Sequence, residues 1–353
     1  MTSSPASRIA PDLLPEALEP VVRQRFPGAR GARIENWRPA TQGFSTETYL
    51  FDLLGLDDGD DDSVGLVFRR PPERPVLPDF DLRRQYLTMD RLRTTDVPVP
   101  TMRWIDAHGT DLGTPYFVMD RIDDAVTVSD VPPYHQAGVF ADADAAGRAE
   151  LWNGCIDVIA SIRAVDPSAR RLGFLDLRAF GSSAPQRLAG FLRYAVGWAS
   201  GSGEPRKEFV DALDWLDGHL YEPEHVGLCW GDSRMSNVLY GNDFDVVAAL
   251  DWEVAYLGDP AGDLAWMLTT DWISSPFPDH APAPGTPSIE ETLDRYRRRT
   301  GMRLDHMQFA QVTAGLLLAV PLLRLNQILD LGDVDLAEIC IERLDHVFGG
   351  GIA

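Results

Sequence analysis

The segment Cys229–Tyr240 reads CWGDSRMSNVLY, and the segment Ala249–Glu253 adds ALDWE a few residues later. Each places a polar stretch beside short β-rich stretches, so we expect Asp232, Asn237 and Asp251 at one end of a small sheet. Two carboxylates and an amide oxygen suit a hard cation such as Mg²⁺, whereas zinc prefers Cys and His. An Asp outside the metal ligands could accept a proton from a hydroxyl nucleophile. The two segments therefore predict a site for phosphoryl transfer to an alcohol.

The spacing of these residues follows a known template. Asn237 lies five residues after Asp232, and Asp251 lies fourteen residues after Asn237. The protein-kinase catalytic loop has the same Asp-to-Asn spacing, and its metal-binding Asp comes on a later strand. The segment 230–267 therefore resembles the aminoglycoside phosphotransferase / choline kinase family, whose members share a kinase-like fold. The resemblance implies that Asp232 is the catalytic base and that Asn237 and Asp251 hold Mg²⁺. Trp230 replaces the family's usual loop His, which is structural.

Two further stretches extend the resemblance. Asp263 lies in the segment that follows the metal-binding Asp, and the resemblance implies that it supports the catalytic loop through backbone hydrogen bonds. The segment 42–49, QGFSTETY, resembles the loop that binds nucleotide phosphates. The implied phosphate contacts are Gly43, Phe44, Ser45 and Thr46.

Three more residues are implied on the nucleotide side. Arg69 stands where the family's strand carries a phosphate-contacting Lys, and a guanidinium can hold phosphate oxygens as a bidentate fork. Gln85 falls where Glu is common, and it could hydrogen-bond to Arg69 without forming an ion pair. The segment 115–120 resembles the interlobe linker, so we expect Met119 beside the adenine of ATP or GTP.

The remaining pattern predicts two lobes. The expected N-terminal elements are a helix over 12–26, strands over 32–37, 46–54, 64–69, 102–106 and 115–121, and a helix over 79–94. The expected later elements are helices over 146–165, 208–220, 289–300, 304–330 and 334–347, and strands over 226–230, 238–240 and 246–250. This is an α+β arrangement. We expect a protein-kinase-like two-lobed fold, with a small β-rich N-lobe (1–120) for the nucleotide phosphates. The larger, mainly helical C-lobe (121–353) would carry the catalytic loop and substrate site.

Composition excludes several classes of protein. The chain has 353 residues with 44% hydrophobic and 24% charged residues, which is typical of a globular protein. Its net charge of −22 disfavours nucleic acid as a partner. The three distant cysteines argue against a disulfide framework or a zinc site. We see no signal peptide and no apolar run long enough to span a membrane, so we expect a cytoplasmic protein without a membrane partner.

The sequence thus predicts an ATP-dependent phosphotransferase that acts on a small-molecule alcohol. The resemblance allows aminoglycosides, macrolides, choline-like alcohols, sugars, homoserine and hydroxyacyl thioesters as acceptors. Acceptor selection is expected in the segments 134–144, 191–203 and 272–286. One alternative is a non-catalytic nucleotide-binding protein of the same fold, which the unusual Arg69 and Gln85 motivate.

A second alternative is a serine hydrolase, because Gly231–Ser233 resembles the nucleophile block of Gly-Asp-Ser esterases. Such enzymes have a late Asp-x-x-His, and none of the seven histidines here has an Asp three residues before it. That reading also leaves Asn237 and Asp251 unexplained.

Overall fold

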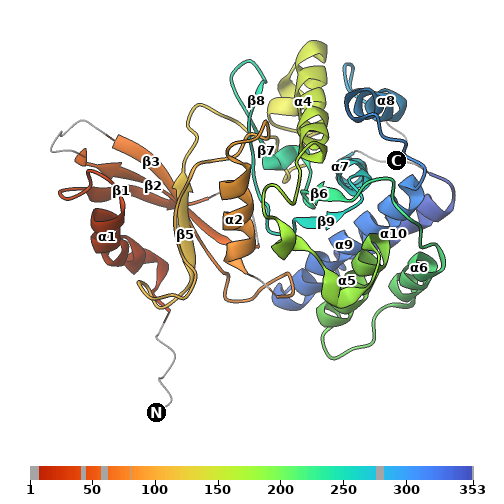
Figure 1. Cartoon of the computed structure of the whole chain (residues 1–353), viewed down its shortest axis with the longest axis horizontal. Helices are drawn as coiled ribbons and strands as arrows, with labels where there is room; N and C mark the ends of the chain where they lie inside the picture. The colour runs from red at the N-terminus through yellow and green to blue at the C-terminus, as the bar shows by residue number, and fades with distance from the viewer. Residues whose placement is uncertain (1–7, 41–44, 57–62, 80, 276–281, 352–353) are drawn as a thin grey trace.

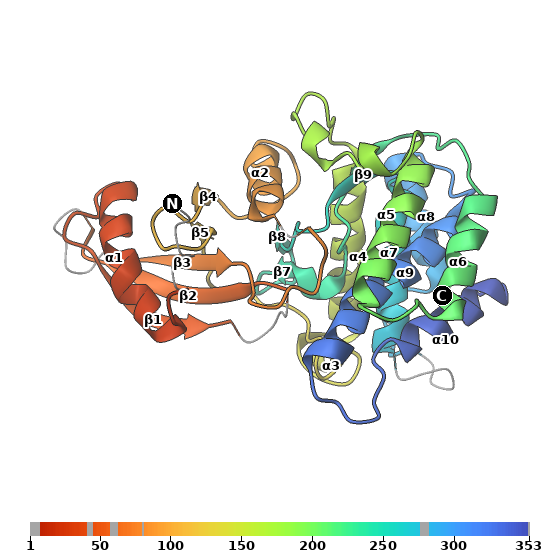
Figure 2. The same cartoon turned by 90° about the horizontal axis from the view of Figure 1, so that it is seen from below.

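The computed structural model describes residues 8–40, 45–56, 63–79, 81–275 and 282–351 (Figure 1). A β-rich part with two α-helices lies at one end, and a larger helical part with two small pairs of antiparallel strands lies at the other. Figure 2 shows helix α2 and strands β7 and β8 between the two parts. The predicted α+β arrangement is confirmed, whereas the boundary at residue 120 stays a prediction.

The β-rich part is a five-stranded antiparallel sheet in the order β1-β2-β3-β5-β4. Its strands are β1 (Arg33–Pro39), β2 (Glu47–Leu54), β3 (Ser63–Arg70), β4 (Met102–Asp106) and β5 (Tyr116–Asp120). All five predicted strands are present, and each strand end lies within two residues of its predicted position. Residues 57–62, between β2 and β3, lie outside the described residues.

Alternation along β3 separates two faces of this sheet. Leu66 and Phe68 point into a fully buried cluster under helix α1 (Leu14–Arg25). Val67 and Arg69 point the opposite way, because successive strand residues alternate between faces. Val67 joins the main core, and Arg69 faces the C-terminal part of the chain. The strand period therefore aims Arg69 into the cleft.

Helix α2 (Leu82–Leu92) covers the cleft side of the sheet. Asp81 caps it by accepting a hydrogen bond from the backbone N–H of Arg83. Leu82, Gln85 and Met89 are buried, at the spacings of three and four that define one helical face. Gln85 and Thr88 are thus polar residues on a mostly apolar buried face.

The C-terminal part is mainly helical. Its helices are α3 (Val139–Asp142), α4 (Ala145–Arg163), α5 (Ala184–Ala199), α6 (Lys207–Gly218), α7 (Ala261–Ser274), α8 (Ile289–Thr300), α9 (Met307–Ile328) and α10 (Glu338–Phe348). Two antiparallel pairs lie among them: β6 (Gly227–Cys229) with β9 (Tyr256–Gly258), and β7 (Val238–Tyr240) with β8 (Val246–Ala249). The sequence analysis did not predict α5 or β9.

Helix α9 is long and apolar enough to cross a membrane by length and composition, and 61% of that window is buried within the protein. It packs against α5, α7 and α10. Its partly buried leucines Leu317, Leu318 and Leu322 line an internal cavity described below. Because α9 packs against helices on one side and lines the cavity on another, it is apolar nearly all round.

One apolar core joins the two parts of the molecule. Met89 of α2 and Phe117 of β5 belong to the same buried cluster as Trp230 and Trp252 of the C-terminal part. Since close-packed interiors deform little, this shared core fixes the position of the sheet against the loop 230–237.

Candidate active site

Asp263 holds the start of the catalytic loop. Its carboxylate accepts the backbone N–H of Trp230 at 2.7 Å and that of Gly231 at 2.8 Å, as the family resemblance implied. Gly231 has a φ of 86°, and a Cβ there would lie 2.4 Å from the carbonyl oxygen of Val254. Only glycine fits this turn. Burial raises the pKa of Asp263 to about 6, against the opposing effect of these hydrogen bonds.

The turn presents Asp232 to the cleft. Its Oδ1 accepts the indole N–H of Trp266 at 2.9 Å and lies 3.0 Å from Nε of Arg234. Burial raises the pKa of Asp232, although the Arg234 charge and the side-chain hydrogen bonds of Asn237 and Trp266 oppose that rise. A carboxylate held in a fixed position beside a cavity is what a general base requires.

Asn237 and Asp251 lie on the same side of the loop. The side-chain amide of Asn237 donates to the backbone oxygen of Asp232 at 2.9 Å. This bond orients Asn237 and leaves its Oδ1 as an acceptor. Asp251 follows β8 in the left-handed region, with a φ of 59°. Both residues line a cavity of about 410 Å³ between the sheet and the C-terminal part.

The oxygen ligands present suit Mg²⁺. An amide oxygen and a carboxylate are hard donors, and Mg²⁺ usually takes one or two protein carboxylates with phosphate oxygens and water. The structure brings no cluster of three or more His, Cys, Asp or Glu into metal-binding geometry among its described residues. The arrangement therefore fits a metal shared with a nucleotide better than an all-protein metal site.

Arg69 and Gln85 both contact Asp251. The guanidinium of Arg69 approaches the carboxylate at 3.4–3.5 Å, and Nε2 of Gln85 donates to Oδ1 at 3.1 Å. The expected hydrogen bond between Gln85 and Arg69 is absent from these described contacts, because the Gln85 amide turns to the carboxylate instead. Both side chains are nonetheless at the cleft, as the resemblance implied.

The phosphate-loop prediction is only partly described. Gly43 and Phe44 lie outside the described residues. Thr46 is buried and its hydroxyl donates to Oε2 of Glu253 at 3.2 Å, and Ser45 lines a cavity beside Asp232. Burial, with the nearby Asp251 charge, raises the pKa of Glu253 to about 8.

Met119 of β5 lies where the adenine contact was expected. It lines the same 410 Å³ cavity as Asn237 and Asp251, together with Leu50 and Val67. These apolar side chains form a hydrophobic wall of the cavity, as is usual for a pocket that binds a nucleotide base.

Arg234 is a site residue that the sequence analysis missed. Its Nη1 donates to Oδ2 of Asp130 at 2.8 Å, and its Nε lies against Asp232. It lines both the 410 Å³ cavity and a second cavity of about 370 Å³, and no other described cation lines both. Its place two residues after Asp232, inside the polar loop, was the available signal.

The second cavity, which we call the acceptor cavity, opens at Asp232. Its polar lining residues are Ser45, Asp130, Asp232, Arg234, Asp251, Glu253 and Thr270. Its wall is aliphatic and comes largely from α9: Val76, Leu77, Val131, Val254, Leu317, Leu318, Pro321, Leu322 and Leu325. No described residue of the segments 134–144, 191–203 and 272–286 lines this cavity, and their part in acceptor selection stays a prediction.

The position of Ser233 argues against the hydrolase alternative. Ser233 is fully buried, and its hydroxyl donates to the backbone oxygen of Asp263 at 2.7 Å. A nucleophile must reach substrate, so Ser233 is structural. Trp230 is structural as well: its indole N–H donates to Leu250 and its ring stacks on Trp252 with centroids 5.5 Å apart.

A small antiparallel sheet, a mainly helical part, and two cavities that share Asp251 and are lined by Asn237 and by Asp232 respectively match the kinase-like phosphotransferase fold. Residues 36–300 match the phosphotransferase enzyme family, and the chain belongs to that family.

Solved structures with this fold confirm the kinase-like architecture. A candidate aminoglycoside phosphotransferase from Ralstonia eutropha superposes with a TM-score of 0.66 at 23% identity, covering 94% of this chain and 95% of that one. A macrolide 2'-phosphotransferase from Brachybacterium faecium gives 0.56 at 18% identity, covering 94% and 98%. The choline kinase of Streptococcus pneumoniae gives 0.58 at 11% identity, covering 95% and 97%.

Curated relatives match over part of their length. Acyl-CoA dehydrogenase family member 10 of Mus musculus is 26% identical over 251 residues, which are 67% of this chain and 22% of that protein. Family member 11 of Homo sapiens is 23% identical over 256 residues, which are 67% of this chain and 30% of that protein. The chain therefore spans less than a third of either relative.

Proposed function

We propose that this protein transfers the γ-phosphoryl group of ATP, or of GTP, to a hydroxyl of a small molecule. The observation that carries the proposal is that Asp232 lines the acceptor cavity beside Arg234 and Asp251, which line both that cavity and the nucleotide-sized one. Asp232 accepts the proton of the attacking hydroxyl, or holds that hydroxyl in line with the γ-phosphorus.

The nucleotide side has its own set of residues. Asn237 Oδ1 and Asp251 would hold Mg²⁺, which neutralises phosphate charge and orients the triphosphate when bound. Arg69 adds a guanidinium beside Asp251 and binds phosphate oxygens as a fork. A related fold, the aminoglycoside phosphotransferase APH(4)-Ia, was solved with AMP-PNP and hygromycin B, which supports a nucleotide in this cleft.

Arg234 supplies positive charge where the phosphoryl group passes between the two cavities. Its guanidinium is tied to Asp130 and Asp232, so it is held in place before substrate arrives. Cationic charge at that point stabilises the charge that spreads over the transferred group. Arg234 is therefore the proposed transition-state cation.

The acceptor cavity favours an alcohol with an apolar chain. Its wall is aliphatic along α9, and its charged lining residues are Asp130, Asp232, Arg234, Asp251 and Glu253. A polycationic aminoglycoside would meet these carboxylates but would also bury polar surface against the leucines of α9, which is costly. Among the acceptors that the family allows, hydroxyacyl thioesters fit best, and the acyl-CoA dehydrogenase names of the mouse and human relatives point the same way.

A panel of alcohols tests this function. Purified protein is mixed with ATP and Mg²⁺ and with one alcohol from each class: a medium-chain hydroxyacyl thioester, a hydroxy acid, choline, homoserine, a sugar, a macrolide and an aminoglycoside. We expect ADP release and a phosphorylated product with the aliphatic acceptors, lost on chelation of Mg²⁺. Tight nucleotide binding without turnover on any acceptor would instead favour the non-catalytic alternative that Arg69 and Gln85 motivate.

A further inference from the structure

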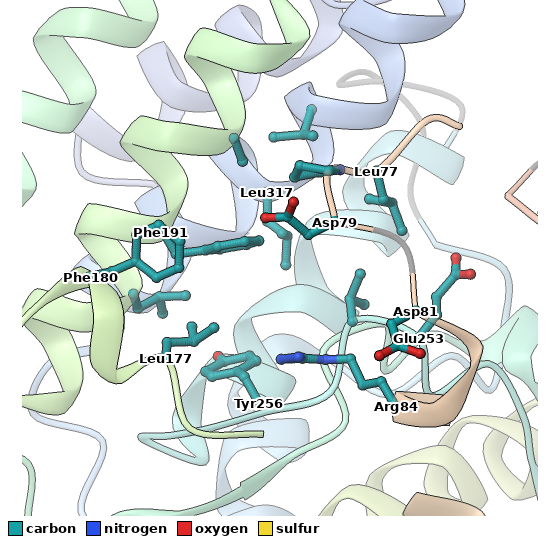
Figure 3. Close-up of a pocket in the computed structure, with 15 residues that line it drawn as sticks. Leu77, Asp79, Asp81, Arg84, Leu177, Phe180, Phe191, Glu253, Tyr256 and Leu317 are labelled. Atoms are coloured by element: carbon teal, nitrogen blue, oxygen red, sulfur yellow. The ribbon is translucent and has the colours of Figure 1, made fainter. Parts of the chain in front are cut away.

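A third cavity lies beside the acceptor cavity and shares Leu77, Glu253, Val254 and Leu317 with it, while its other lining residues differ. Its volume is about 140 Å³, roughly one third of the nucleotide-sized cavity. It is enclosed by the start of α2, the loop before it, α5, β9 and α9. The apolar walls include the aromatic rings of Phe180, Phe191 and Tyr256 and the side chain of Leu317 (Figure 3). None of the residues proposed for phosphoryl transfer lines it.

One cation faces this cavity without a carboxylate partner. Nε of Arg84 donates to the backbone oxygen of Ala255 at 3.1 Å. Among the described residues, no carboxylate lies within ion-pair distance of Arg84, and its two terminal nitrogens have no hydrogen-bond partner. Burial lowers the pKa of Arg84 despite the more distant Asp81 charge, which marks an incompletely compensated cation. The carboxylate of Asp81 is bonded to Arg83 instead.

Three carboxylates line the same cavity: Asp81 is bonded to Arg83, Glu253 accepts the hydroxyl of Thr46, and Asp79 remains. Asp79 lies at the exposed mouth, and its φ of 51° places it in the left-handed region, uncommon for residues other than glycine. Tyr194 hydrogen-bonds to it, but no described cation forms an ion pair with it. Figure 3 shows Asp79 and Arg84 on opposite sides of the cavity, with Phe191 on a third side. The two opposite charges are therefore separated by an apolar space.

We propose that this cavity binds a small zwitterion with an apolar side chain, such as an aliphatic or aromatic α-amino acid. The carboxylate binds the Arg84 guanidinium, which offers a fork of donors that matches a carboxylate. The ammonium group binds Asp79. The apolar side chain fills the space against Phe180 and Phe191. A ligand with only one charge would leave the opposite wall charge unpaired.

The position of the cavity connects it to the active site. Arg84 is followed by Gln85, which hydrogen-bonds to Asp251. An occupant bound to Arg84 and packed on α5 holds the first turn of α2 against the C-terminal part. The ligand is thus a candidate effector, distinct from the phosphoryl acceptor.

Calorimetric titration of the full-length protein without nucleotide tests the proposal. Leucine and phenylalanine are the probes, and neither carries an alcohol hydroxyl, so the result does not depend on phosphoryl transfer. 4-Methylpentanoate and 3-methylbutylamine are leucine analogues that each keep one charge. We expect both amino acids to bind, and each analogue to bind at least about tenfold more weakly, as expected for one lost charged hydrogen bond.

Variants locate the site. Arg84→Gln and Asp79→Asn each remove one charged wall group and should abolish leucine binding. Arg93→Gln and Asp90→Asn remove the same two charges from an exposed pair outside the cavity, and should bind leucine unchanged. Ala195→Leu fills the cavity from α5 and should block binding while keeping both charges. Circular dichroism checks that each variant is folded.

Three outcomes would overturn the proposal. The first is no binding of any apolar amino acid at millimolar concentration. The second is binding of 4-methylpentanoate as tight as that of leucine, which would indicate a simple anion site. The third is unchanged leucine binding by folded Arg84→Gln or Ala195→Leu, which would place the ligand elsewhere. Leucine binding that survives in Asp232→Asn would show that the effector site and the proposed catalytic site are separate.

Discussion

Arg69 and Asp251 lie 182 residues apart in the sequence and meet in the cleft, with Nη2 of Arg69 3.4 Å from Oδ1 of Asp251. Gln85 reaches the same carboxylate oxygen from α2. One carboxylate on the C-terminal side thus gathers a cation from the sheet and an amide from the helix. This arrangement places positive charge immediately beside the proposed metal ligand, where nucleotide phosphates would lie.

Arg69→Gln should weaken nucleotide binding. The variant keeps polar groups at the site but removes the charged fork, and the loss of charge-assisted hydrogen bonds of about 1.5–3 kcal/mol corresponds to about 10–100-fold in Kd. Titration of Mg²⁺-ATP by calorimetry measures it. Arg103→Gln, on the exposed side of β4, is the control and should bind normally. Equal affinity in Arg69→Gln would contradict the phosphate role of Arg69.

Arg234→Gln should slow the chemical step. If the guanidinium stabilises the transferred group, kcat falls by about 10²–10³-fold, while the Kd of Mg²⁺-ATP changes little. Steady-state kinetics with the preferred acceptor, beside a binding titration, separates the two effects. A loss of nucleotide affinity with unchanged kcat would move Arg234 from the reacting group to the ground-state nucleotide site.

Asp263→Asn should destabilise the catalytic loop. One oxygen becomes an NH₂ group, which must then face a backbone N–H of Trp230 or Gly231. The expected cost is about 1–3 kcal/mol of unfolding free energy at neutral pH, measured by urea denaturation. Asp305→Asn is an exposed control with little expected effect. A variant as stable as the parent protein would show that these two bonds do not hold the loop.

The difference in unfolding free energy between the parent protein and Asp263→Asn should depend on pH. Burial raises the pKa of Asp263 to about 6 from the ordinary value of 3.8. Between these values the folded protein binds the proton more tightly than the unfolded chain, so this contribution to stability falls as pH rises. The advantage of the parent protein over Asp263→Asn should therefore shrink by about 3 kcal/mol from pH 4 to pH 7. An advantage that grows over this range would contradict the raised pKa.

Leu322→Ala should weaken acceptor binding alone. Leu322 and the adjacent Leu323 on α9 both pack against the same buried cluster, but only Leu322 lines the acceptor cavity. Removing part of the apolar wall should cost about 1–2 kcal/mol of acceptor binding, seen as roughly a tenfold rise in KM for an aliphatic acceptor. Leu323→Ala is the matched control for helix stability. An equal rise of KM in both variants would indicate a general disturbance of α9.

Helices and strands were predicted well where the hydrophobic residues follow a single spacing, that of a helix or that of a strand. The strand 102–106, the strand 238–240 and the helix 289–300 have the predicted bounds, because short β-rich runs and a capped amphipathic helix are local signals. Helix α5 was missed because glycines at 190 and 197 weaken its helical pattern. Strand β9 has only three residues and exists through its pairing with β6, which is a tertiary contact.

The site also combines residues that a sequence motif indicates with contacts that depend on how the chain packs. Asp232, Asn237, Asp251 and the support from Asp263 followed from spacing and family resemblance. The bond from Gln85 to Asp251 did not, because it depends on how α2 docks on the loop. The acceptor wall was also missed: the leucines of α9 read as core from the sequence, and only the fold shows that some of them line a cavity.

The most direct test of the central claim is a single-turnover transfer of labelled γ-phosphoryl from ATP to the best acceptor. Folded Asp232→Asn should lose about 10²–10⁴-fold in rate and keep its affinity for Mg²⁺-ATP. Ser233→Ala, which removes the neighbouring buried hydroxyl, should keep the transfer rate. Undiminished transfer by Asp232→Asn would contradict the account, because the proposed base would then have no part in the reaction.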